Sequence, residues 1–82
     1  MSLLTSTEII RIRDLGTLNR GDEVEAHLRN AVHYRGRVED TAPGIGVVWI
    51  RDDADGRRAI LHAEEYAIWL IRTVPFESSM AA

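Results

Sequence analysis

The sequence predicts a mainly β protein, a small and strongly bent five-stranded barrel preceded by a short helix. Three observations favour this class. Apolar and polar residues alternate in strand-length runs that are separated by turn residues. A glycine, Gly36, interrupts the second of these runs, as is typical where a short sheet bends sharply. The chain has only 82 residues, which is enough for one small core and too few for several domains.

Residues 1–20 form an amino-terminal segment in which two local signals disagree. Thr5 and Glu8 have the spacing of a capping box, which favours a short helix that ends at Gly16. The alternation of Ile10-Arg11-Ile12-Arg13 favours a strand instead, because its apolar members are β-branched and recur with period two. We expect the helix, with the strand as the alternative.

Residues 21–74 are expected to form the barrel. The first two strands alternate, and their inward residues are Val24, Ala26 and Leu28, followed by Val32, Tyr34, Gly36 and Val38. The third strand is the apolar run 45–50, and the fourth is 57–62, after a polar hairpin loop. A single tight helical turn at 63–66 leads to the fifth strand, 67–74. Pro75 lacks an amide donor and ends this strand. We expect residues 75–82 to be a flexible tail, because it has little to bury beyond Phe76.

The barrel segment resembles two groups of small β proteins. Leu18-x-x-Gly21-Asp22-x-Val24, followed by Tyr34-x-Gly36-x-Val38, resembles the start of SH3-like barrels, which include Tudor and KOW modules. A short helix ahead of five strands, with an apolar third strand, is similar to the Sm-like fold of Hfq-type RNA chaperones. Leu61-His62-Ala63 resembles the Lys-His-Ala element that lines the RNA-binding pore of that family, with Leu61 in place of the lysine. The resemblance covers residues 5–74 and implies a small binding module.

Composition and residue placement exclude several classes of function. The chain has no cysteine, so it has neither a thiolate metal site nor a cysteine nucleophile. Its serines lie near the termini, and a barrel this small is filled by its own side chains, so we expect no enzyme. The loop 53–56 does not match a calcium loop, and we expect no metal and no cofactor. Without a signal peptide or a run of ~20 apolar residues, a cytoplasmic protein that contacts no membrane is expected.

Basic residues make nucleic acid the first candidate ligand. Ten arginines, no lysine and thirteen acidic residues give a net charge of -3, so a basic surface must be local. Arginine on a small barrel can contact phosphate and stack on bases. The predicted contact residues, which share a strand face or follow the hairpin loop, are His33, Arg35, Arg37, Arg57, Arg58 and His62. The alternative is that outward glutamates pair with these arginines, namely Glu23, Glu25 and Glu39.

Two apolar runs, 47–50 and 68–71, predict self-association, because they carry apolar side chains on both strand faces. The predicted interface residues are Val48, Ile50, Ile68 and Leu70. We therefore expect a non-enzymatic homo-oligomer that binds single-stranded RNA or DNA. The alternative is a protein-interaction or assembly module that binds a protein partner and no nucleic acid. It would use an exposed edge strand or an aromatic mouth, for which the candidates are Tyr34, Trp49, Tyr66 and Trp69.

Overall fold

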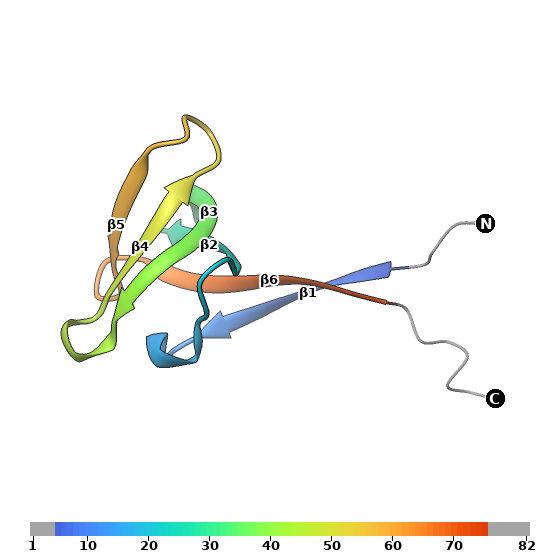
Figure 1. Cartoon of the computed structure of the whole chain (residues 1–82), viewed down its shortest axis with the longest axis horizontal. Coiled ribbons are helices and arrows are strands. Elements are labelled where there is room, and N and C mark those ends of the chain that lie inside the picture. The colour runs from blue at the N-terminus through green and yellow to red at the C-terminus, as the bar shows by residue number, and fades with distance from the viewer. Residues whose placement is uncertain (1–4, 76–82) are drawn as a thin grey trace.

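The computed structural model describes residues 5–75, which form one antiparallel sheet of six strands (Figure 1). In chain order the strands are β1 (Thr5–Ile12), β2 (Glu23–Leu28), β3 (Ala31–Ala42), β4 (Val47–Asp52), β5 (Arg58–His62) and β6 (Ala67–Pro75). Two single turns of 3-10 helix lie between strands, η1 (Leu15–Thr17) and η2 (Pro43–Ile45). The predicted mainly β class is confirmed.

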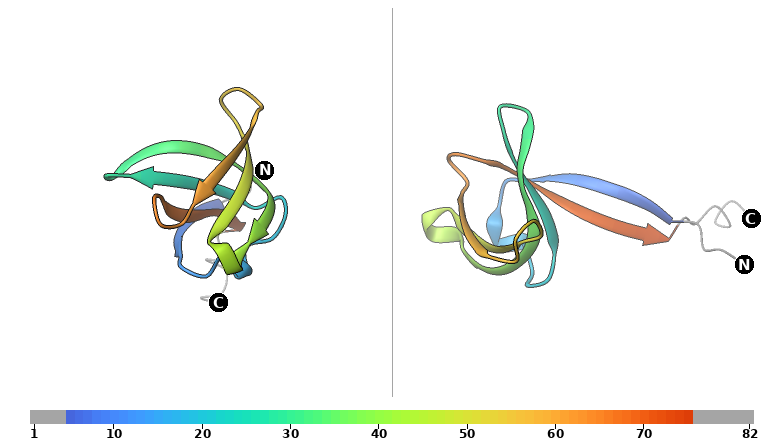
Figure 2. Two further views of the ribbon diagram at one scale, coloured as in Figure 1. Left: turned by 90° about the vertical axis from the view of Figure 1, so that its left-hand side faces the viewer. Right: turned by 90° about the horizontal axis from the view of Figure 1, so that it is seen from above.

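The strands are ordered β1-β6-β2-β3-β4-β5 across the sheet. Strands β2 to β5 follow one another as antiparallel neighbours, and β6 then returns to pair with both β2 and β1. The sheet is unclosed, with β1 and β5 at its edges, and it curls around one core (Figure 2). The prediction of five strands in a barrel is therefore corrected to six strands in an open sheet.

The predicted amino-terminal helix is wrong, because residues Thr5–Ile12 form strand β1. Cross-strand pairing with β6 decides this, since Ile10 lies opposite Leu70 and Ile12 lies opposite Ile68. Ile12 also packs against the core, a contact that the local capping signal could not reveal. Gly16, where the helix was expected to end, lies in the turn η1, and its amide donates a hydrogen bond of 2.9 Å to the Asp14 carboxylate. Residues 76–82 of the predicted tail lie outside the described residues.

A core of nine buried residues fills the concave side of the sheet, and they are Leu15, Leu18, Val24, Ala26, Val38, Val48, Ile50, Leu61 and Ile68. Val48, Ile50 and Ile68, which the sequence assigned to a subunit interface, are at most 1% exposed, and Leu70 packs against the same core. The side chains of Val48, Ile50 and Ile68 are therefore unavailable to a partner, whereas Leu70 is only partly buried. Of the predicted inward residues, Val32 is the exception, with 52% of its surface exposed.

Gly36 is a point of close approach between β3 and β4. A methyl group at this position would lie 2.8 Å from the carbonyl carbon of Arg51 and closer still to its oxygen. Only glycine therefore allows the two backbones to approach in this way. The register irregularities that curl the sheet lie elsewhere, at Ala26/His27 in the β2–β3 pair and at Val38/Asp40 in the β3–β4 pair.

A two-stranded ribbon projects from the curled part of the sheet (Figures 1 and 2). Strand β6 pairs with β2 only as far as Ile71, whereas its pairing with β1 continues to Pro75. The outer part of the ribbon thus consists of residues 5–8 and 72–75. It carries an ion pair of 2.7 Å between Glu8 and Arg72. Within residues 5–75, no helix has the length and apolarity needed to span a membrane.

Candidate functional site

Three arginines form a row across the outer face of the sheet. Arg37 on β3 is the Cα partner of Arg51 on β4, and Arg51 is in turn the partner of Arg58 on β5. Directly opposed residues in an antiparallel pair project from the same face, so the three arginines start from neighbouring positions on one face of the sheet. Like charges in this arrangement destabilise a sheet unless an anion lies among them.

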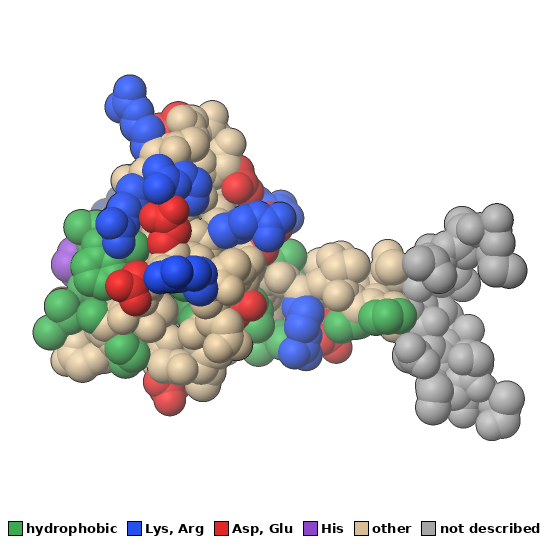
Figure 3. Space-filling view, in the orientation of Figure 1, with side chains coloured by type: hydrophobic (Ala, Val, Ile, Leu, Met, Phe, Trp, Pro, Cys, Tyr) green, Lys and Arg blue, Asp and Glu red, His purple; other side chains and the backbone are tan. Residues whose placement is uncertain are grey.

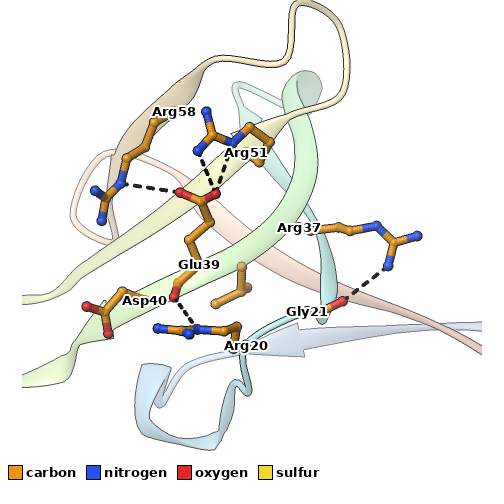
Figure 4. Close-up of a pocket in the computed structure, with 8 residues that line it drawn as sticks. Arg20, Gly21, Arg37, Glu39, Asp40, Arg51 and Arg58 are labelled. Carbon is orange, nitrogen blue, oxygen red and sulfur yellow. Dashed lines mark hydrogen bonds and ion pairs between the residues drawn. The ribbon is translucent and has the colours of Figure 1, made fainter.

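Glu39 supplies that anion from the bulge in β3. The register passes from Val38 to Asp40, which leaves Glu39 without a partner in β4 and turns its side chain toward the row (Figure 4). Its Oε2 atom accepts a hydrogen bond of 2.9 Å from Arg51 Nε and lies 2.8 Å from Arg51 Nη2. Its Oε1 atom lies 3.4 Å from Arg58 Nε. One carboxylate therefore faces two guanidinium groups.

The row and its bulge line a hollow of about 560 Å³, which we call the arginine groove, with Arg20, Gly21, Arg37, Val38, Glu39, Asp40, Arg51 and Arg58 at its walls. Arg20 enters from the loop before β2 and donates a 3.1 Å hydrogen bond to the Glu39 carbonyl oxygen. Arg37 donates one of 3.4 Å to the Gly21 carbonyl oxygen. Both acceptors are uncharged carbonyl oxygens, so these bonds do not neutralise the charges of Arg20 and Arg37. Four arginines and two carboxylates leave the lining with a net charge of +2, although the chain carries -3.

The structure divides the six predicted nucleic-acid contacts into separate groups. Arg37 and Arg58 lie in the arginine groove. Arg57 lines a smaller hollow beside Asp52 and Asp55, which Arg58 also lines. His62 lies on edge strand β5 opposite Val47 and is not a lining residue of the groove. Arg20 and Arg51 were missed, because their place in the site depends on the strand register and on a loop.

Arg35 and His33 precede Arg37 in β3 and lie outside the arginine groove. Arg35 Nε donates a 2.7 Å hydrogen bond to Glu23 Oε2, and Arg35 Nη1 lies 3.4 Å from Glu25 Oε2. The hydrogen bond to Glu23 and the charge of that carboxylate raise the pKa of Arg35. Pairing with glutamates, the alternative drawn from the sequence, is thus realised at Arg35 and, through Glu39, at Arg58. His33 lies with its ring centroid 6.2 Å from that of Tyr66.

The four aromatic residues proposed for a mouth have different neighbours. Tyr34 and Tyr66 meet edge to face at 5.7 Å, and both are partly buried against the core. Burial raises the pKa of Tyr66 above its ordinary value. Trp49 lies under the guanidinium of Arg58, at 5.6 Å from ring centroid to Cζ. Trp69 lies 5.7 Å from the ring of His27.

Among residues 5–75, no group of three or more histidine, aspartate or glutamate side chains is arranged to hold a metal ion. No protein-family model matches the chain, and no curated protein or solved structure is significantly similar to it. Within residues 5–75, the arginine groove concentrates positive charge in a hollow of an acidic protein, an arrangement that favours an anionic ligand.

Proposed function

We propose that the protein is a non-enzymatic module that binds nucleic acid through the arginine groove. The observation that carries this proposal is the row of Arg37, Arg51 and Arg58 on three neighbouring strands, in which one carboxylate, Glu39, pairs with Arg51 and Arg58 while Arg37 has no acidic partner in the row. A bound phosphate would relieve their mutual repulsion, and the planar guanidinium fork matches phosphate geometry. Phosphate contacts of this kind supply affinity and position the ligand without reading its sequence.

The topology supports a barrel-like module of SH3-like type. Strands β2 to β5 form a meander, a hydrogen-bonded turn at 63–66 follows, and β6 returns to pair with β2. In this interpretation β1 is an addition to the five-stranded unit. A strand in place of the amino-terminal helix removes one of the features that resembled Sm-like proteins. We therefore favour the SH3-like alternative, which does not depend on a pore.

The test measures binding of a fluorescent single-stranded RNA or DNA by anisotropy at several salt concentrations. We expect Arg37→Gln and Arg51→Gln each to weaken binding several-fold and to reduce the salt slope by about one, because each removes one phosphate contact. Arg72→Gln is the matched control, since Arg72 lies on the ribbon and pairs with Glu8. Absence of salt-sensitive binding by the unaltered protein, or an equal effect of Arg72→Gln, would refute the proposal.

A second candidate function is assembly through strand β1, which the projecting ribbon favours. A two-stranded ribbon is marginally stable in water, and β1 is an eight-residue edge strand with unpaired backbone groups. Ile9 on this strand is 57% exposed. A second copy that added its own β1 would extend the sheet and cover Ile9.

Light scattering at tens of micromolar tests this assembly. We expect the unaltered protein to have a dimer mass and Ile9→Lys to shift it toward the monomer. Ile45→Lys is the matched control, because Ile45 is 72% exposed but lies in η2, away from β1. A monomer mass for the unaltered protein would exclude the assembly function and leave the nucleic-acid proposal unaffected.

A further inference from the structure

Next to the arginine groove lies a surface of different chemistry, formed by Trp49, Arg58 and Ile60. Trp49 and Ile60 are Cα partners across the β4–β5 pair, and Arg58 lies two residues before Ile60 on the same face. Trp49 is half-buried, whereas Ile60 is 53% exposed. Figure 3 shows hydrophobic side chains gathered beside the charged side chains that cover this face of the molecule. We call these three residues the stacking platform.

Arg58 belongs to both surfaces. Its Nε atom lies 3.4 Å from Glu39 Oε1 in the groove, and its Cζ atom lies 5.6 Å from the centroid of the Trp49 ring. The guanidinium is thus held between a carboxylate and an indole ring, while 53% of the side chain remains exposed. A planar cation that is fixed in this way offers its free face for stacking.

We propose that the stacking platform receives an unpaired base of a single-stranded nucleic acid whose phosphates lie in the arginine groove. The inference rests on the proposed function and specifies its ligand. Unpaired bases stack on aromatic rings and on arginine planes, and every base has a face suited to this. In a duplex the bases are paired and stacked on one another, so the platform would remain unused. The protein should therefore prefer single strands to duplexes.

The experiment compares ligands that share phosphates but differ in bases. The probes are an oligothymidylate of about ten nucleotides, an abasic deoxyribose-phosphate chain of the same length and a duplex of the same length. We expect the oligothymidylate to bind about tenfold more tightly than the abasic chain, because stacking is lost in the latter. Trp69→Phe leaves Trp49 as the only tryptophan, and its fluorescence should be quenched by the oligothymidylate but not by the abasic chain.

Arg58→Lys is the matched variant, because lysine keeps the charge but lacks the plane. We expect it to reduce the affinity ratio between oligothymidylate and abasic chain from about tenfold toward unity. The ratio in the unaltered protein needs no substitution, so a poorly folded variant does not prevent the test. Equal binding of the two chains without quenching would overturn the stacking platform and leave the groove proposal standing. If none of the three probes binds, both the stacking platform and the groove proposal are overturned.

Discussion

Replacing Glu39 with glutamine should change stability and ligand affinity in opposite directions. The Glu39 carboxylate is 31% exposed and pairs with Arg51 and Arg58, which are 51% and 53% exposed. Exposed pairs contribute about 0.2–1 kcal/mol each, so Glu39→Gln should lower the free energy of unfolding by about 1 kcal/mol. The same carboxylate occupies the place where a phosphate would bind. At 4 Å in a water-like medium, the repulsion between this carboxylate and a bound phosphate is about 1 kcal/mol. Removing the carboxylate charge should therefore strengthen oligonucleotide binding about fivefold.

The assay combines urea titration with fluorescence anisotropy at low salt. Glu8→Gln is the control, because it changes the net charge equally and also breaks an arginine pair, at 2.7 Å from Arg72 on the ribbon. We expect Glu8→Gln to lose similar stability and to leave the affinity unchanged. If Glu39→Gln binds more weakly than the unaltered protein, then Glu39 organises the arginines for the ligand and does not compete with it.

Three further predictions concern the core and the aromatic pair. Gly36→Ala should lower the free energy of unfolding by more than about 3 kcal/mol in urea titration, because the new methyl group would meet the Arg51 backbone; a loss under ~1 kcal/mol would contradict the close approach. Ile50→Ala should cost about 2–5 kcal/mol without changing the mass in light scattering, since Ile50 is fully buried within one chain. Burial raises the pKa of Tyr66 above its ordinary 10.0, so as the pH rises this phenol loses its proton in the unfolded chain before it does in the folded one. The free energy of unfolding should therefore fall above pH 10.0, and Tyr66→Phe should reduce this fall in thermal melts at several pH values.

Local alternation was sufficient to predict most of the strands. Val24 and Ala26 face inward as expected, because strict alternation next to a turn leaves a strand little freedom of register. The prediction failed for residues 5–12 because the capping box was preferred to the alternation, which indicated the strand that forms there. The pairing of Ile12 with Ile68 decided between them, and a contact across more than fifty residues of sequence leaves no local signal.

The candidate site was only partly predictable for the same reason. Arg37 and Arg58 carry a recognisable signal, since each lies on a strand of alternating pattern. Arg51 ends an apolar run, and its position between them follows from the register of β4 with both neighbours. The apolar runs were assigned to an interface because they filled both faces of a strand. In the folded chain one face of β4 enters the core, and Trp49 on the other face is half-covered beneath Arg58.

The position of β6 has a consequence for how the nascent chain folds. Among the strands of residues 5–75, β6 is the last in the sequence, yet it lies between β1 and β2 in the sheet. Until it leaves the ribosome, β1 has no neighbour and Val24 and Ala26 on β2 lack the cover of Ile68. Such long-range closure is slow compared with local hairpin formation. We therefore expect the sheet to acquire its native structure in one cooperative step after β6 has been synthesised.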